Sequence, residues 1–211
     1  MLTKNINNYI EKYKNTSPSF LIRLESFMKD KNFGYDAKLK LEKLANKIIN
    51  NKEESLKIVF YIIPEATPRP RLSLITGRFY VKNSKSNNDY MELVVNKNED
   101  IIDFITTPCS FTVNNFLEIP KSFNKFDIIL AEMGLIRPIT KPDWDNLGKT
   151  YSDMIQKHIL LDDSLIVDGS SHKYYSLKPR VEIIINYKLN HDSKHNKRII
   201  DKKLKKIYTK E

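Results

Sequence analysis

Four side chains between residues 143 and 163 have the types and spacing to do chemistry together. Asp143 and Asp145 lie at the start of a predicted helix, Lys149 follows four residues after Asp145, and Asp163 lies in the loop beyond. Clustered carboxylates repel one another unless a cation joins them. Oxygen ligands without thiolate or adjacent histidine favour Mg²⁺, or Mn²⁺ as the alternative, over zinc. Such an ion activates water and stabilises the charge on a cleaved phosphodiester, and a nearby lysine stabilises the same charge.

The same residues also have an ordinary structural interpretation. An aspartate at a helix start accepts hydrogen bonds from free backbone amides and interacts favourably with the helix dipole. Lys149 and Asp153 are four residues apart and could form an exposed ion pair of little value. From the spacing alone this interpretation is the stronger one. Convergence of Asp143, Asp145 and Asp163 at the helix start is therefore an expectation for the tertiary structure to test.

The elements that would position these residues follow from the surrounding pattern. Pro142 disfavours helical backbone before it, so a helix is expected over residues 143–158. Its apolar side chains should face a core, and they are Trp144, Leu147, Tyr151, Met154 and Ile155. Further helices are predicted over 2–14, over 17–30, from 36 onward, over 87–104 and over 124–133. Strands are predicted over 56–63, 110–119, 165–175 and 180–188, with a hairpin around Thr76-Gly77.

This interleaving of strands and helices predicts an α+β fold, a small mixed β-sheet packed with helices. Residues 56–63 are apolar on both faces, which indicates a buried strand. We expect a helical N-terminal extension over 1–52, which serves packing or dimer contacts. A compact domain over 53–188 and a basic C-terminal tail over 189–211 should follow.

Composition excludes several classes of protein. The chain has 211 residues, of which 40% are hydrophobic, enough to bury a core and to exclude wholesale disorder. No apolar run is long enough to span a bilayer, and the first residues lack the continuous apolar stretch of a secretory signal. A single cysteine, Cys109, excludes an internal disulfide and a Cys-rich zinc site, and we expect a small buried thiol there. We therefore expect a soluble, cytoplasmic protein without a membrane partner.

The net charge of +10 is concentrated at the two ends of the chain. Residues 1–60 hold 12 basic and 7 acidic residues, residues 61–140 hold 9 of each, and residues 188–211 hold 9 and 3. Residues 141–187 hold 6 basic and 7 acidic residues, so the centre is slightly acidic. A basic surplus points to a polyanion, most often nucleic acid, although solubility is an equally good explanation from charge alone.

Two basic segments are candidates for binding nucleic acid. Arg69, Arg71, Arg78, Lys82 and Lys85 carry positive charge, and no acidic residue lies across 69–86. A basic hairpin of this kind fits a duplex or junction backbone. In the tail, we expect a lysine-rich segment to become helical on DNA, with Lys202, Lys203, Lys205 and Lys206.

A resemblance to a known family favours the catalytic interpretation of these residues over the structural one. The run KPDWDNLGK at 141–149, followed by Asp153 and by LLDDS at 160–164, resembles the RusA family of Holliday-junction resolvases, also called crossover-junction endodeoxyribonucleases. Their signature has the form KPDxDNxxK…D…DD. The likeness covers about residues 56–187, and it includes PRPR at 68–71, GRFY at 77–80, IPKS at 119–122 and PRVEI at 179–183.

The resemblance implies roles for individual residues. Asp143, Asp145 and Asp163 fall on the metal-binding, catalytic carboxylates and Lys149 on the catalytic lysine, while Asp162 is a second-tier candidate. Basic positions suited to the DNA backbone are Arg69, Arg71 and Lys173, to which the hairpin adds Arg78.

The resemblance also implies a function. The expected protein is a Mg²⁺-dependent, structure-selective endodeoxyribonuclease that resolves Holliday junctions and related branched DNA in recombination and repair. The family acts as a homodimer, which allows paired symmetric nicks. The main alternative is a branched-DNA-binding protein that does not cut, and a third is an RNA-binding protein.

Other signals in the sequence are weaker. A restriction-type PD…(D/E)xK pattern fails because no suitable (D/E)xK follows residues 142–143. His191 and His195 are expected to be solvated, and no Gly-rich phosphate loop exists, so ATP use is not expected. Gly148 lies within the predicted helix, where glycine costs roughly 1 kcal/mol relative to alanine.

Overall fold

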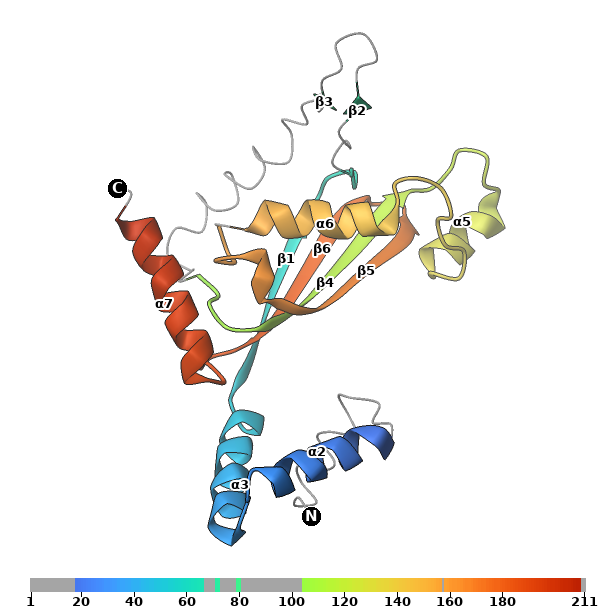
Figure 1. The fold of residues 1–211 in the computed structure, drawn as a ribbon. Helices are drawn as coiled ribbons and strands as arrows, with labels where there is room; N and C mark the ends of the chain where they lie inside the picture. The colour runs from blue at the N-terminus through green and yellow to red at the C-terminus, as the bar shows by residue number, and fades with distance from the viewer. Residues whose placement is uncertain (1–17, 67–70, 73–78, 81–103, 157, 210–211) are drawn as a thin grey trace. The chain divides into compact units, whose positions relative to one another are not determined.

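The computed structural model describes residues 18–66, 71–72, 79–80, 104–156 and 158–209. The chain divides into two compact units, residues 1–52 and 53–211. In the first unit, α2 (Pro18–Asp30) and α3 (Tyr35–Ile49) agree with the predicted helices (Figure 1). The helix predicted over 2–14 and most of that predicted over 87–104 lie outside the described residues.

The second unit contains the sheet and the helices that pack on it. In chain order its elements are β1 (Glu53–Phe60), β2 (Arg71–Leu72), β3 (Phe79–Tyr80), β4 (Cys109–Glu118), α5 (Lys125–Glu132), α6 (Trp144–Ile155), η1 (Asp163–Leu165), β5 (Ile166–Ser176), β6 (Arg180–Lys188) and α7 (Lys194–Tyr208). The hairpin expected around Thr76-Gly77 is described at its two ends, where β2 and β3 pair antiparallel.

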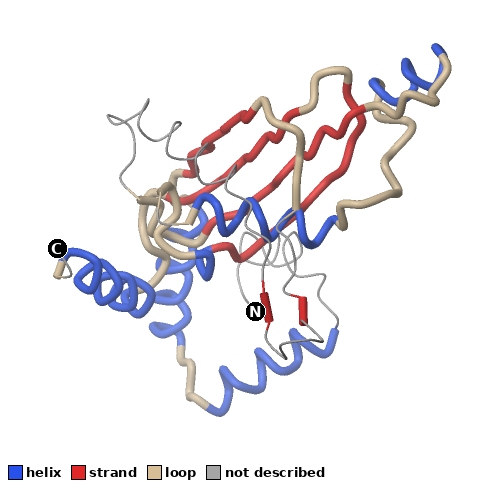
Figure 2. The backbone as a smooth tube through the Cα atoms, turned by 90° about the horizontal axis from the view of Figure 1, so that it is seen from above, coloured by secondary structure: helices blue, strands red, loops and turns tan. Residues whose placement is uncertain are grey.

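The four-stranded sheet is mixed and has the strand order β1-β6-β4-β5. β6 pairs antiparallel with both β1 and β4, whereas β4 and β5 are parallel. Parallel neighbours need a crossover connection, and α5 and α6 lie within the connection from β4 to β5. Figures 1 and 2 show the four strands side by side with α6 lying across them. The predicted α+β fold with a mixed sheet and preceding N-terminal helices is confirmed.

The first strand differs from its prediction. Residues 56–63 were expected to be buried on both faces, but β1 alternates between exposed and partly buried residues, and only Phe60 is fully buried. Tyr61 and Ile63 beyond it are 73% and 52% exposed. The reason is topological, because β1 is an edge strand that pairs with β6 alone among the described strands.

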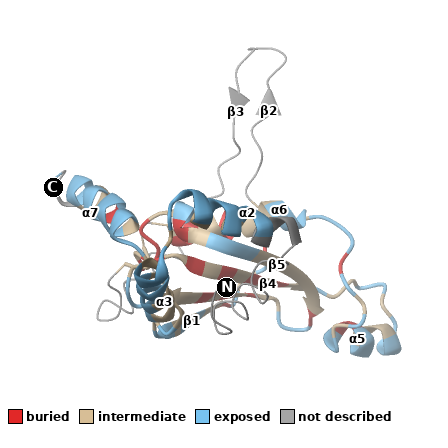
Figure 3. Cartoon of the chain, turned by 60° about the horizontal axis from the view of Figure 1, so that its bottom comes forward, coloured by how far each residue is buried: buried red, intermediate tan, exposed pale blue. Residues whose placement is uncertain are grey.

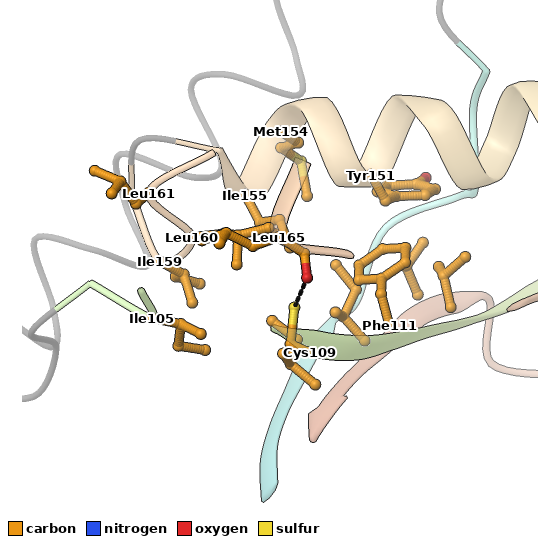
Figure 4. Close-up of a cluster of buried hydrophobic side chains, with 14 of the residues drawn as sticks. Ile105, Cys109, Phe111, Tyr151, Met154, Ile155, Ile159, Leu160, Leu161 and Leu165 are labelled. Atoms are coloured by element: carbon orange, nitrogen blue, oxygen red, sulfur yellow. Dashed lines mark hydrogen bonds between the residues drawn. The ribbon is translucent and has the colours of Figure 1, made fainter. Parts of the chain in front are cut away.

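The core lies between the sheet and α6. Val113 of β4, Val181 of β6 and Leu147 and Tyr151 of α6 are fully buried. Figure 3 shows buried segments on α6 and on the strands beneath it. α6 ends at Ile155, earlier than predicted, because the backbone of the next residue is extended (ψ 138°). The apolar residues that follow turn into the same core, as Figure 4 shows for Ile159, Leu160 and Leu161.

Gly148 has a packing reason that the sequence did not reveal. A Cβ atom at this position would lie 3.3 Å from the Cβ of Ser171 on β5. Contacts that short are tighter than most real ones, so glycine allows α6 to approach β5 closely. The helix-propensity cost of Gly148 is therefore offset by close packing between the helix and the sheet.

Beyond β6, the chain forms a helix that packs on the domain. We expected the lysine-rich segment to become helical on DNA, and in the structure it already forms the helix α7. Ile200 of α7 is 5% exposed within the main core, and Leu204 packs against that core. This apolar side holds the helix in place, because burying it against the domain stabilises helical structure that a short isolated segment would not keep.

Candidate active site

The start of α6 places Asp143 and Asp145 at the protein surface. Asp143 occupies the N-cap position with an extended backbone, but its side chain makes no capping hydrogen bond. Asp145 lies in the first helical turn, and both residues are exposed. The structure therefore does not support helix capping as the explanation for Asp143.

Asp145, Lys149 and Asp153 share the outer side of α6. All three are exposed, whereas Leu147 and Tyr151 of the same helix are fully buried. Their four-residue spacing places them one helical turn apart along this side. In the part of the chain that the structure describes, no ion pair joins Lys149 to Asp153, so the pair that their spacing allows does not form.

Trp144 departs from its prediction. Its side chain is 62% exposed and does not enter the core. Trp144 is the first residue of α6, and the buried residues of this helix begin only at Leu147. Trp144 and Asp143 border a surface cleft of about 580 Å³. The other residues that line the cleft are Arg137, Pro138, Ile139, Thr140, Lys141, Ser171, His172 and Lys173. The Asp143 carboxylate thus shares this cleft with the cationic side chains of Arg137, Lys141 and Lys173 and with the exposed ring of Trp144.

Lys173 holds the loop that leads into Asp143. Its Nζ donates hydrogen bonds to the backbone oxygens of Thr140 (2.5 Å) and Pro142 (3.0 Å). Arg137 Nε donates to the Lys173 oxygen (2.6 Å), and the Arg137 guanidinium lies 3.8 Å from the centre of the Tyr174 ring. These contacts fix the approach to α6. The sequence predicted a DNA-binding position at Lys173 and gave no sign of Arg137.

Asp163 lies in η1, immediately before β5, and is exposed. Its neighbour Asp162 accepts hydrogen bonds from the Ser164 amide (3.0 Å) and the Ser164 hydroxyl, and pairs with Lys203 Nζ (2.9 Å). The Ser164 hydroxyl, and then Lys203, hold the pKa of Asp162 below its ordinary value, against the opposing effect of burial. Asp162 is therefore engaged in capping η1 and in joining it to α7.

The geometry separates Asp163 from the other two carboxylates. Lys173, whose ammonium binds the loop before Asp143, is the eighth residue of β5, and Asp163 precedes the first. Seven strand residues span about 23 Å, and the twelve residues of α6 span about 18 Å. The expected convergence at the helix start does not occur within one chain.

The metal-binding expectation can be tested against this arrangement. Carboxylate oxygens are the donors that Mg²⁺ prefers, so the residue types fit. The arrangement does not, because the described residues contain no group of three or more His, Cys, Asp or Glu side chains placed to hold an ion. Within a single chain, Asp143, Asp145 and Asp163 therefore do not form a complete metal site.

The remaining predicted positions have mixed outcomes. Arg69 and Arg78 lie outside the described residues, and Arg71 is described only as backbone in β2. Cys109 is 2% exposed and its Sγ donates to the Leu165 oxygen (3.5 Å; Figure 4). Burial raises the pKa of Cys109 to about 11, and the expected small buried thiol is confirmed.

The histidine expectation holds for one residue of the two. His195 is exposed, whereas His191 is partly buried and its Nδ1 has no hydrogen-bond partner among the described residues. The cause is the packing of the segment after β6 against the domain, where His191 lines a cavity with Leu165 and Ile200.

Comparison with known proteins settles the family. A family model described as endodeoxyribonuclease RusA matches residues 62–186, which is more than half of the chain. The chain belongs to the RusA family. RusA proteins are Holliday-junction endonucleases that act on branched DNA and depend on a metal ion.

The chain also has a curated relative over much of its length. The chain is 37% identical over 137 residues to an uncharacterized protein, YqaN, of Bacillus subtilis strain 168. The match covers 63% of this chain and 96% of that protein. Among the residues that the structure describes, no helix is long and apolar enough to cross a membrane.

Proposed function

We propose that this RusA-family chain is a Mg²⁺-dependent, structure-selective endodeoxyribonuclease that resolves four-way DNA junctions in recombination and repair. The observation that carries the proposal is the start of α6, where Asp143 borders a cationic cleft beside the exposed ring of Trp144. Cationic groups attract phosphates, and an exposed indole provides a surface on which an unpaired base can stack. An exposed carboxylate in such a cleft has little use for binding a polyanion alone.

The proposed roles remain those of the motif. Asp143, Asp145 and Asp163 are the proposed metal-binding carboxylates, and Mn²⁺ is the alternative ion. Lys149, exposed one helical turn after Asp145, is proposed to stabilise negative charge at the scissile phosphate. Lys173 and Arg137 are proposed to position Asp143 through the preceding loop.

A second copy of the chain would explain the separated carboxylates. Asp143 and Asp145 lie at one end of α6, and Asp163 lies close to its other end. A two-fold axis that sets two such units antiparallel would bring Asp163 of the partner subunit to the helix start, and would do so twice. We propose that the active unit is a homodimer with two sites, each built from both subunits. Two equivalent sites suit paired symmetric nicks.

The cleavage assay uses a synthetic four-way junction with products mapped on all four strands. Paired symmetric nicks in Mg²⁺ or Mn²⁺, lost in EDTA and in Asp145→Asn, support the proposal. Asp30→Asn, at an exposed position of α2 outside the motif, is the matched control and should cut normally. Binding in Ca²⁺ without products in any metal would support the non-cutting alternative, and stronger competition by duplex RNA than by junction DNA would favour RNA binding.

Subunit mixing tests the shared site. Asp145→Asn and Asp163→Asn should each be inactive as homodimers. If sites are shared, each mixed dimer contains one intact and one doubly altered site, so an equal mixture recovers about a quarter of wild-type nicking, as single nicks. If each site belongs to one chain, every site carries one substitution and the mixture stays inactive, which would disprove sharing.

A further inference from the structure

Helix α7 has two chemically different sides. Its inner side carries Ile200 and Leu204, which pack on the core. On the same side, Lys203 Nζ pairs with Asp162 (2.9 Å) and donates to Ser164 Oγ (3.1 Å). Asp162 and Ser164 flank Asp163 in η1. The helix is therefore fastened to the turn that contains one of the proposed catalytic carboxylates.

The outer side of α7 is strongly cationic. The helix contains seven basic residues and one acidic residue, Asp201. Four of the basic residues recur at every fourth position and are exposed, namely Lys194, Arg198, Lys202 and Lys206. Successive members lie about 6 Å apart along the helix axis and on neighbouring parts of its surface. Figure 3 shows most of α7 in the colour of exposed residues.

This row has an energetic consequence. Like charges four residues apart destabilise a helix by roughly 0.2–0.5 kcal/mol per pair, and Asp201 lies near only part of the row. A polyanion that lies along the row removes this repulsion and releases its own counterions. An evenly spaced row of cations on a helix already docked to the nuclease unit thus fits a phosphate backbone.

We propose that α7 is an additional DNA-binding surface, in which Lys194, Arg198, Lys202 and Lys206 contact the phosphates of one arm of the branched substrate. The inference rests on the proposed junction-cleaving function. It concerns a helix that follows the region matched by the family model, residues 62–186. Because Lys203 fastens α7 to η1, an arm bound along α7 is held close to Asp163.

The test removes the row and measures junction affinity at several salt concentrations in Ca²⁺. The variant carries Lys194→Gln, Arg198→Gln, Lys202→Gln and Lys206→Gln, because glutamine keeps helix propensity while removing charge. Each phosphate contact contributes about −0.9 to the slope of log K against log salt. The slope should therefore become less negative by up to about 3.6 for four lost contacts.

A matched control distinguishes the effect of this row of cations on DNA binding from the effect of net charge. The exposed lysines of α3, in the other unit, give a variant with the same loss of four charges: Lys38→Gln, Lys40→Gln, Lys43→Gln and Lys47→Gln. This control should keep most of the wild-type slope. Equal losses in both variants would show a general charge effect and overturn the proposal, as would an unchanged slope in the α7 variant.

Two further readouts keep the test decisive. Far-UV circular dichroism checks that α7 remains helical, and if the fourfold variant unfolds, the two halves of the row are tested as pairs, each with about half the slope change. A wild-type protein that neither binds nor cuts junctions would overturn the proposed function and this inference together. Wild-type cleavage with an unchanged α7 slope would overturn this inference alone.

Discussion

Lys173 of β5 shows how a basic residue beside a proposed active-site carboxylate can act on the protein itself. Its ammonium group binds the loop before α6 at two backbone positions, the oxygens of Thr140 and Pro142. Hydrogen bonds that involve a charged group contribute about 1.5–3 kcal/mol each. Without these two hydrogen bonds, the loop before Asp143 would lose the side-chain contacts from β5 that hold it.

We therefore predict that Lys173→Met slows junction cleavage at saturating DNA by about 10- to 100-fold, while junction affinity in Ca²⁺ changes less than threefold. The reason is that misplacing a reacting group by about 1 Å can cost 10²-fold in rate. Single-turnover kinetics and binding titrations measure the two effects separately. Lys178→Met, at an exposed position two residues beyond the end of β5, is the control. Weaker binding with an unchanged rate would instead assign Lys173 to DNA contact.

At the level of elements, the contact of α6 with β5 depends on Gly148. We predict that Gly148→Val lowers the free energy of unfolding by about 1–3 kcal/mol, because the added methyl groups overpack the contact with Ser171. Urea unfolding measures the loss. Ser171→Gly in the same chain should restore at least half of it. No recovery in the double variant would mean that the loss arises within α6 and not between the helix and the strand.

The Lys203–Asp162 ion pair joins α7 to η1, and its contribution to stability should depend on pH. Because the folded-state pKa of Asp162 is lowered, its stabilisation is complete above the unfolded value, 3.8, and is lost as pH falls through the folded value. We predict that Lys203→Met destabilises the protein at pH 7 by less than about 1 kcal/mol, since the pair is partly exposed. The difference should shrink below pH 4. Urea unfolding at pH 7 and pH 3 measures it.

Lys205→Met, at an exposed position of the same helix, is the control for this ion pair. It should leave stability unchanged at both pH values, because Lys205 makes no ion pair among the described residues. A Lys203→Met effect that persists at pH 3 would indicate lost packing of the lysine stem instead of a lost charge pair.

On the scale of the whole molecule, a net charge of +10 should make binding to DNA depend strongly on salt. We predict that junction affinity in Ca²⁺ falls by about 10²-fold or more between 50 and 200 mM salt, which corresponds to four or more phosphate contacts. Fluorescence anisotropy measures this. Linear duplex of equal length should show a similar slope, since the salt-dependent part of binding comes from phosphate contacts that both DNAs offer. An affinity that does not change with salt would contradict charge-driven binding.

Much of the fold follows from local chemistry and was predictable. Alternating or continuous apolar residues located β4, β5 and β6, and Pro142 located the start of α6, because these signals depend on neighbours in sequence. The motif around Asp143 also indicated the family. The spacing of Ile200, Leu204 and Ile207 in fact marks α7 as an amphipathic helix, a signal that our expectation of a DNA-dependent helix passed over.

Other features depend on contacts between residues distant in sequence. The edge position of β1 follows from the order of the strands. Trp144 is exposed because the first turn of α6 lies outside the core, and the role of Gly148 follows from the close approach of Ser171. The loop tether by Lys173 and Arg137 is of the same kind, because it joins positions more than 30 residues apart.

The sequence by itself determined the family, the α+β class and the residue types of the candidate site, since motif, periodicity and composition are properties of the chain in one dimension. Only the tertiary structure decided which of those residues meet. Within one chain it sets Asp163 at the far end of β5 from Asp143, and it fastens α7 beside Asp163 through Lys203 and Asp162. The physical reason is that a rigid helix and strand convert a separation of twenty residues into a fixed distance, which spacing in sequence does not reveal.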